Sequence, residues 1–389
     1  MTEACIVGWA HSPFGKLDDP DVESLIARVA GAAIADAGVT PTDVDGVFVG
    51  MFNNGFSKQD FPASLVLQAV PELRFTRATR FENACASGSA AVYGARDWLA
   101  AGRGRFALVL GVEKMTATPG PQVGDALLSA AYRREEGDIP AGFAGVFARI
   151  AERYFQRFGD QSDALAAIAA KNHRNGVDNP YAQMRRDLGY EFCRTASEKN
   201  PYVAPPLKRT DCSLVSDGAA ALVLTDEETA RGMGKAVRFR AAVQVNDFLP
   251  LSRRDPTRFE GAARAWNGAL CDAGIKLGDL SMAEVHDCFT IAELLVYEAM
   301  GLTPAGEGAR AVLDGWTAKD GRLPINPSGG LKSKGHPIGA TGVSMHALAA
   351  MQLTGEAGGM QLPKVDRVGV FNMGGAAVAN YVSILERLE

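Results

Sequence analysis

The feature that most constrains the fold is an internal repeat. Residues 36–44 and 272–280 both begin with Asp-Ala-Gly, both follow a helical pattern and both lead into a strand-like segment. A second pair, residues 217–221 and 374–378, shares Gly-Ala-Ala at the start of an apolar strand. These tripeptides are common, but the shared helix-to-strand context favours duplication. We therefore expect two similar α/β halves.

The first half is the longer one, which places an insertion at about residues 115–207. We predict an N-terminal half formed by residues 1–114 and 208–232, and a C-terminal half formed by residues 233–389. The insertion has one clear helical pattern, at residues 161–171. Long excursions from a compact fold often serve a function, so we expect a lid or ligand-binding region, with a solvated or subunit-contacting surface as the alternative.

Composition narrows the class of protein. The chain has 389 residues, 47% hydrophobic and 22% charged, which allows a large core. The net charge of −5 argues against bulk nucleic-acid binding. No apolar run suits a membrane span and no signal peptide is evident, so we expect a cytoplasmic enzyme without a membrane partner. The six widely spaced cysteines predict reduced thiols and no metal site.

Cys85 is the first candidate catalytic residue. It lies among small residues, directly before a helical pattern at residues 90–101. The free N–H groups at a helix N-terminus stabilise a thiolate, which favours a nucleophile. A buried cysteine in a tight helix contact is the alternative explanation.

His336 is the second candidate. It lies in a glycine-rich loop, residues 326–342, with Pro337 after it and a helix expected from Val343. In the duplicated scheme this loop is the counterpart of the Cys85 segment, so the two side chains should face each other. A cysteine paired with a histidine is typical of a nucleophile and its activating base.

Two further candidate site segments lie at the carboxyl ends of predicted strands. His286-Asp287-Cys288-Phe289 precedes a helical pattern, and catalytic groups concentrate at such carboxyl ends in α/β folds. Asn372-Met373-Gly374-Gly375 follows the strand at residues 368–371. Its paired glycines could point bare N–H groups at an oxyanion.

Together these segments resemble the motifs of the thiolase superfamily, and more narrowly the sterol-carrier-protein-2-type thiolases, which include acetyl-CoA acetyltransferases. The matching motifs are N-A-C-A-S-G at residues 83–88, H-D-C-F at 286–289 and G-H-P-I-G-A-T-G at 335–342. Residues 212–220 look like the end of the pantetheine-binding loop. The resemblance spans the chain in order, and it implies a duplicated five-layer α-β-α-β-α fold with an inserted loop domain that binds CoA and the acyl group.

The resemblance also implies roles for individual residues. Cys85 takes the acyl group, His336 accepts its proton, and His336 with His286 stabilises the enolate oxygen. Cys288 is the acid/base. The remaining expected contacts are the backbone N–H groups of Cys85 and Gly374 as an oxyanion hole, and substrate or CoA binding by Ser213, Asn326 and Gly335. One departure is that Asn372 stands where most thiolases carry their acid/base cysteine, so Cys288 is the candidate replacement.

The implied function is CoA-dependent acyl transfer. The enzyme would cleave 3-ketoacyl-CoA by thiolysis, or condense acyl-CoAs, through an acyl-Cys85 intermediate. Coenzyme A is then a co-substrate, with no permanently bound cofactor, and a homodimer or dimer of dimers forms through the central helices. The alternatives are a decarboxylating ketoacyl synthase, a retro-aldolase, and a CoA-ester-binding subunit that works with a small OB-fold, zinc-ribbon partner.

Overall fold

Nine strands form one mixed sheet in the computed structural model, which describes residues 3–388. Their order is β3-β2-β4-β7-β1-β8-β11-β10-β9. The bounds are β1 Ala4–His11, β2 Gly46–Gly50, β3 Arg77–Phe81, β4 Phe106–Glu113, β7 Gly218–Asp226, β8 Val237–Asn246, β9 Met282–Val285, β10 Arg367–Gly374 and β11 Ala379–Arg387. Strands β1 and β8 pair only at Cys5–Arg238 and Ile6–Val237, so a narrow seam joins two half-sheets.

The two half-sheets repeat one topology. In the first half-sheet, the parallel strands β3, β2 and β4 lie beside the antiparallel strands β7 and β1. In the second, the parallel strands β9 and β10 lie beside the antiparallel strands β11 and β8. A single parallel bridge between Ile325 and Ala283 stands where the first half has β3 beside β2. This confirms the duplicated α/β architecture that the sequence repeat predicts.

The repeated Asp-Ala-Gly segments form the same turn in both halves. Helix α1 (Val22–Asp36) leads through a 3₁₀ turn to β2, and helix α10 (Glu260–Ala273) leads through another to β9. In the first turn the Asp43 carboxylate accepts the Thr40 N–H at 2.7 Å. In the second, Asp279 accepts the Lys276 N–H at 2.8 Å. The repeat therefore encodes a capped turn that starts each parallel strand.

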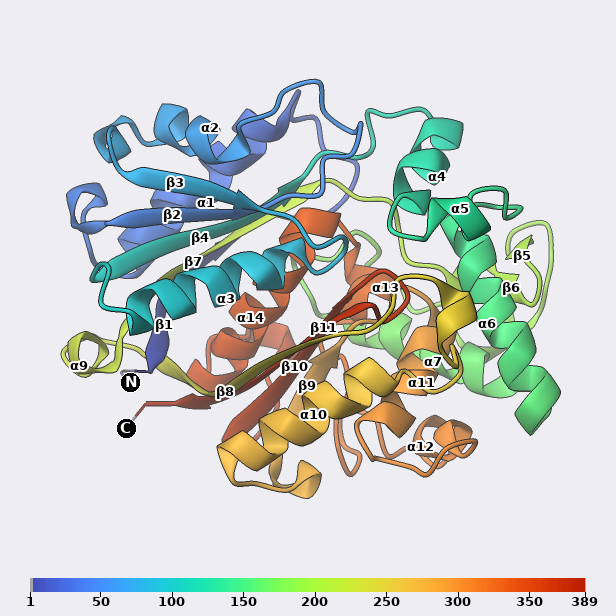
Figure 1. Ribbon diagram of the computed structural model, residues 1–389. Helices are drawn as coiled ribbons and strands as arrows, with labels where there is room; N and C mark the ends of the chain where they lie inside the picture. The colour runs from blue at the N-terminus through green and yellow to red at the C-terminus, as the bar shows by residue number, and fades with distance from the viewer. Residues whose placement is uncertain (1–2, 389) are drawn as a thin grey trace.

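Helices and half-sheets alternate in five layers (Figure 1). Helices α1 and α2 (Pro62–Ala69) cover the outer face of the first half-sheet, and α10 covers the second with α11 (Thr290–Ala299) beside it. Helices α3 (Ser87–Ala100) and α14 (Ile338–Thr354) fill the middle. Every residue of α14 except Thr354 is buried, because both half-sheets pack on it.

Glycines let the two central helices approach at their N-terminal ends. A Cβ at Gly88 of α3 would lie 2.7 Å from the Gly339 carbonyl oxygen of α14. A Cβ at Gly339 would lie 2.4 Å from the Val112 carbonyl oxygen. Neither position has room for a methyl group, so the first turns of α3 and α14 are held in backbone contact. Cys85 and His336 each stand just before one of these turns.

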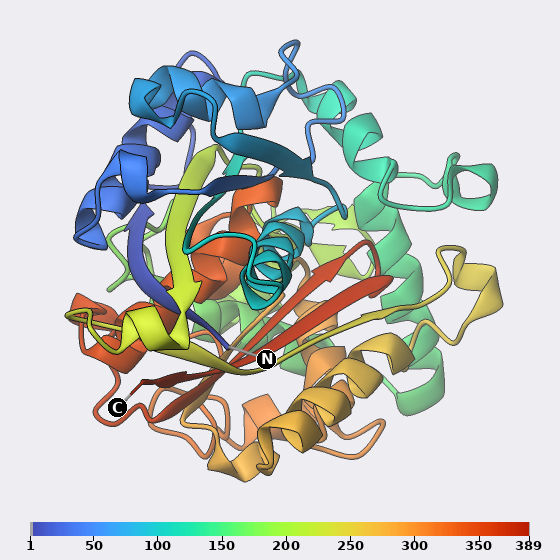
Figure 2. The ribbon, with the colours of Figure 1, turned by 60° about the vertical axis from the view of Figure 1, so that its left-hand side comes forward.

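The segment between β4 and β7 gathers at one end of the sheet (Figure 2). It contains α4 Gly120–Leu128, α5 Arg133–Glu136, α6 Phe143–Phe158, α7 Ser162–Gly176, α8 Tyr190–Arg194 and the hairpin of β5 Tyr202–Ala204 with β6 Leu207–Lys208. The sequence pattern indicated only the helix that became α7. Helix α6 carries its apolar residues on one face, and Phe147 on that face stacks on Phe289 with ring centroids 4.4 Å apart.

The remaining helices and turns connect these layers. They are α9 Glu227–Ala230, α12 Gly308–Leu313, α13 Gly330–Lys334 and the 3₁₀ turns Pro41–Asp43, Pro71–Leu73, Arg209–Asp211, Leu251–Arg253, Leu277–Asp279 and Gly358–Met360. None of the helices within residues 3–388 is both long and apolar enough to cross a membrane.

Candidate active site

Cys85 lies in a tight turn between β3 and α3. The Ser87 hydroxyl accepts the Asn83 N–H at 2.9 Å and donates to the Ala84 carbonyl at 2.6 Å, which closes the turn. Ala84 takes a left-handed conformation, with φ at 49°. Such strain in a non-glycine residue is concentrated at functional sites. The end of β10 presses on the same turn, since a Cβ at Gly374 would lie 2.3 Å from the Asn83 carbonyl oxygen.

Burial sets the protonation of Cys85. The side chain is 4% exposed, and this burial raises the pKa of the thiol to about 12. The nearby backbone N–H of Gly375 acts on the pKa in the opposite direction. The free side chain is therefore a thiol that needs a base. The sequence predicts the Gly374 N–H as an oxyanion donor, whereas the backbone N–H that lowers the pKa of Cys85 belongs to the next residue. The role of Gly374 stays a prediction.

His336 presents a basic nitrogen to the site. The Thr341 hydroxyl donates to the Pro337 carbonyl at 3.0 Å, so its oxygen accepts from Nδ1–H of His336 at 2.6 Å. The other nitrogen, Nε2, then carries the lone pair and has no hydrogen-bond partner among the described residues. Burial and the nearby Lys334 ammonium lower the pKa of His336 to about 3, so the free imidazole is neutral.

His286 approaches from the end of β9. Its ring stands 86° to that of His336, with centroids 5.1 Å apart. Nδ1 lies 2.9 Å from Nδ2 of Asn372, and Nε2 has no partner within residues 3–388. Burial first, and then His336 and Lys334, hold the pKa of His286 well below its usual value.

The structure brings these three side chains together. The Cys85 sulfur and one ring nitrogen from each of His286 and His336 lie within 4.8 Å of one another, and all three residues are buried. Cysteine and histidine are also zinc ligands. The hydrogen bonds on the two Nδ1 atoms decide between metal binding and proton transfer, as argued below.

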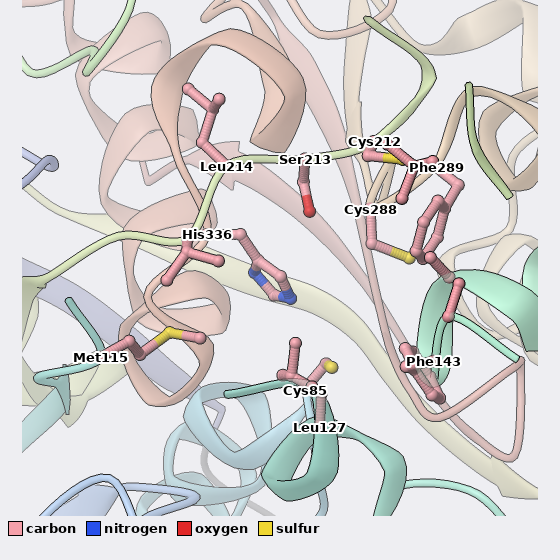
Figure 3. A pocket seen from close by; sticks show the side chains of 15 residues that line it. Cys85, Met115, Leu127, Phe143, Cys212, Ser213, Leu214, Cys288, Phe289 and His336 are labelled. Carbon is pink, nitrogen blue, oxygen red and sulfur yellow. The ribbon is translucent and has the colours of Figure 1, made fainter. Parts of the chain in front are cut away.

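Cys85 and His336 open onto a cavity of about 160 Å³. In Figure 3 the His336 ring, the sulfurs of Cys85 and Cys288 and the Ser213 hydroxyl surround one space. The rest of the wall is mostly apolar and includes Met115, Leu127, Ala141, Phe143, Ala144, Val203, Cys212, Leu214, Val215 and Phe289. Several of these belong to the segment at residues 115–207, in which no individual pocket residue could be identified from the sequence. His286 is not among the residues that line the cavity, but one of its ring nitrogens lies within 4.8 Å of the Cys85 sulfur.

Cys288 is held in the same cavity wall as Cys85 by a link between two segments. Its carbonyl accepts the Ser213 N–H at 2.8 Å, and Cys212 bridges to Phe289. Burial and then the neighbouring Cys85 thiol raise the pKa of Cys288 well above its usual value. Cys288 is therefore also a neutral thiol at rest.

Asp287 and Asn326 support the site from behind. The Asp287 carboxylate accepts the Leu331 N–H at 2.6 Å and so fixes the start of α13. Asn326 accepts the Val285 N–H at 2.8 Å and donates to Glu293 at 3.0 Å, in a buried network away from the cavity wall.

Gly335 is confined by its neighbours. Its φ is 111°, and a Cβ there would lie 2.6 Å from the Ser216 hydroxyl. That hydroxyl also accepts the His336 N–H at 3.0 Å. Substrate contacts by Ser213, Asn326 and Gly335 all stay predictions; of the three, Ser213 lines the cavity.

Comparisons with known proteins agree along the whole chain. The family model "Thiolase, N-terminal domain" matches residues 4–189, and "Thiolase C-terminal domain-like" matches residues 244–387. An acetyl-CoA acetyltransferase of Methanothermobacter thermautotrophicus is 35% identical over 100% of both chains. Human sterol carrier protein 2 is 31% identical over 96% of this chain and 70% of its own length.

A solved structure described as "Ltp2-ChsH2(DUF35) aldolase" superposes with a TM-score of 0.85. It covers 99% of this chain and 97% of its own, at 23% sequence identity. A likeness at this identity concerns the fold alone, and it agrees with the layered α/β architecture.

Proposed function

Because the chain belongs to the thiolase family, we propose that Cys85 carries the acyl group in its CoA-dependent acyl transfer. The protein is an acyltransferase of thiolase type. One observation carries the residue assignment: the Cys85 sulfur lies within 4.8 Å of a nitrogen of His336 and of His286, beside the cavity that also contains Cys288.

The first step forms the acyl-enzyme. The Cys85 thiol gives its proton to Nε2 of His336, and the sulfur attacks the keto carbon of a 3-ketoacyl-CoA. Negative charge develops on the keto oxygen, where backbone N–H groups of Cys85 and of the glycine pair at residues 374–375 stabilise it. Collapse of this intermediate breaks the carbon–carbon bond and leaves the acyl group on Cys85.

The departing fragment is the enolate of a shorter acyl-CoA. Its oxygen accepts hydrogen bonds from His286 and from His336, which now carries the proton of Cys85. The Cys288 thiol protonates the enolate carbon and becomes a thiolate. That thiolate then deprotonates coenzyme A, whose sulfur attacks the acyl-Cys85 carbonyl. Collapse of this intermediate releases the second acyl-CoA and the Cys85 thiolate, which takes its proton back from Nε2 of His336. Every step reverses, so the same residues condense two acyl-CoAs.

The cavity suits a short acyl group. Its volume of about 160 Å³ and its apolar wall, including Leu127, Phe143 and Phe289, leave room for a few carbon atoms beside the sulfur. We therefore propose acetyl and acetoacetyl thioesters of coenzyme A as substrates. Coenzyme A acts as co-substrate, and no permanently bound cofactor is part of the proposed cycle.

The proposal is tested by product analysis. Purified protein is incubated with acetoacetyl-CoA and coenzyme A, and acyl-CoAs are quantified by liquid chromatography with mass spectrometry. We expect two acetyl-CoA per acetoacetyl-CoA consumed, and no product with Cys85→Ala. Conversion of a malonyl thioester with release of carbon dioxide would instead indicate a ketoacyl synthase. Activity only after addition of a small OB-fold, zinc-ribbon protein would favour the partner-dependent alternative.

A further inference from the structure

We propose that Asn372 is a positioning residue that holds His286 as its Nε2–H tautomer, so that His286 donates a hydrogen bond to the substrate oxygen. The inference rests on the proposed function for the identity of that oxygen. Its structural part, the position of one proton on His286, is independent of any reaction. Asn372 does not line the cavity, and the role proposed for it is exerted through its contact with His286.

The orientation of the Asn372 amide is fixed by two different partners. One end of the amide lies 3.2 Å from the Cys85 carbonyl oxygen, which can only accept, so that end is the NH₂ group. The other end accepts the Ser89 hydroxyl at 2.8 Å. Gly342 packs against this second end, since a Cβ there would lie 2.6 Å from Oδ1 of Asn372.

This orientation determines the tautomer of His286. The same NH₂ group lies 2.9 Å from Nδ1 of His286, so its second hydrogen points at that nitrogen. A proton on Nδ1 would face a second proton, and therefore Nδ1 accepts. A neutral imidazole that accepts at Nδ1 carries its hydrogen on Nε2. That buried N–H has no partner among residues 3–388, and in the proposed function it is the group that donates to the substrate oxygen.

The two histidines thus have opposite tautomers. Thr341 makes Nδ1 of His336 a donor and Nε2 a base, whereas Asn372 makes Nδ1 of His286 an acceptor and Nε2 a donor. Two equal tautomers would supply either two bases or two donors. A cycle that starts by deprotonating a thiol and continues by holding an oxyanion needs one of each.

The assignment also bears on metal binding. A metal ligand must offer a lone pair, and Nε2 of His286 carries a hydrogen in this arrangement. Changing that would require the Asn372 amide to turn its NH₂ group away from the Cys85 carbonyl. The cluster of Cys85, His286 and His336 therefore fits proton transfer better than zinc binding.

The direct test is nuclear magnetic resonance of protein labelled with ¹⁵N at its five histidines. The His286 signals are assigned by their loss in His286→Gln. In the unaltered protein we expect a protonated Nε2 and an unprotonated Nδ1. In Asn372→Asp the new carboxylate accepts, so Nδ1 of His286 should become protonated. Asn372→Leu is the second variant, in case the Asp variant does not fold. It removes the hydrogen bond to Nδ1 without adding a charge, so His286 should show a mixture of both tautomers.

Asn380→Asp is the matched control, because Asn380 is a fully buried residue of β11 whose side-chain NH₂ donates only to backbone carbonyls. It should leave the His286 signals unchanged. A proton on Nδ1 of His286 in the unaltered protein would overturn the inference. The inference would also be overturned if His286 had the same tautomer in the unaltered protein and in both Asn372 variants.

A kinetic measurement adds a readout that a purely structural role would not affect. Asn372→Asp should slow thiolysis by on the order of 10²–10³, the typical effect of losing one oxyanion donor, while acetyl-CoA still acylates Cys85. Equal loss of both steps would contradict the positioning role. An unaltered protein that shows the expected tautomer but no acylation would refute the proposed function and leave the His286 assignment standing.

Discussion

At the scale of single residues, the resting site is electrically neutral. Cys85 and Cys288 are thiols because burial raises their pKa values, and His286 and His336 are neutral because burial lowers theirs. Papain-like sites instead store a thiolate and an imidazolium. In the proposed cycle, the proton moves from Cys85 to His336 only when a substrate is present to be attacked.

The pH dependence of Cys85 alkylation tests whether this residue is a neutral thiol in the free protein. Because the pKa of Cys85 is raised to about 12, its thiolate fraction rises steadily across the range in which proteins are stable. We expect the rate of inactivation by iodoacetamide to increase by about tenfold per pH unit from pH 6 to 9 without a plateau. Peptide mapping checks that the label is on Cys85, since Cys271 is exposed. A plateau below pH 8 would indicate a preformed ion pair.

Cys288→Ala separates the two halves of the cycle. The variant lacks the proposed proton donor for the enolate but keeps Cys85 and His336, whose sulfur and ring nitrogen lie within 4.8 Å of each other. We expect thiolysis of acetoacetyl-CoA to fall by on the order of 10²–10⁴ while transfer of acetyl from acetyl-CoA to Cys85 remains. Rapid-quench analysis measures both steps. If acylation falls as far as thiolysis, Cys288 has another role.

At the scale of elements, glycines position the nucleophile and its base. A Cβ at Gly339 would meet the Val112 and Gly50 carbonyl oxygens at 2.4 and 2.6 Å, and backbone atoms cannot move aside as a flexible side chain can. The first turn of α14 must then shift and carry His336 with it. The separation of Cys85 and His336 therefore depends on the contact of α14 with α3 and β4.

We predict that Gly339→Ala destabilises the protein by about 1–3 kcal/mol, and that the activity remaining in folded protein also falls. Gly31→Ala in the exposed face of α1 is the control, because no atom lies within 4 Å of its added methyl group. It should stabilise the protein by about 0.5–1 kcal/mol. Denaturant unfolding measures both. Equal stabilities of the two variants would contradict the packing argument.

The sequence predicts elements that recur and misses contacts that join distant segments. The repeated turn at Asp43 and Asp279 predicts the duplicated architecture, and the thiolase-like motifs indicate Cys85 and His336 as candidate catalytic residues. Helix α6 was not predicted, because its apolar face is stabilised by contacts with distant residues such as Phe289. The hydrogen bond between Asn372 and His286 joins residues 86 positions apart, and no local pattern records it.

At the scale of the whole molecule, one edge of the sheet has the features of a surface for self-association. Strand β3 ends the sheet and pairs only with β2, and Phe75 just before it is 88% exposed. Unpaired edge strands with apolar neighbours are templates for association. Helix α14 is enclosed within the chain, so of the two central helices only α3 has surface for an intersubunit contact.

We therefore predict a homodimer through β3 and α3. Light scattering after size-exclusion chromatography should give twice the chain mass of 41.1 kDa. Phe75→Ser should weaken the dimer, because it removes exposed apolar surface from the proposed interface. Leu313→Ser, a change of similar size at another exposed residue, is the control. A monomer in the unaltered protein, or equal dissociation of both variants, would rule out this interface.

The most direct test of the central claim is intact-protein mass spectrometry after brief incubation with acetyl-CoA. We predict an acetyl-sized adduct on the unaltered protein, its retention in Cys288→Ala and its absence in Cys85→Ala. Absence of any adduct from folded, unaltered protein, or an adduct that persists in Cys85→Ala, would contradict acyl transfer through Cys85.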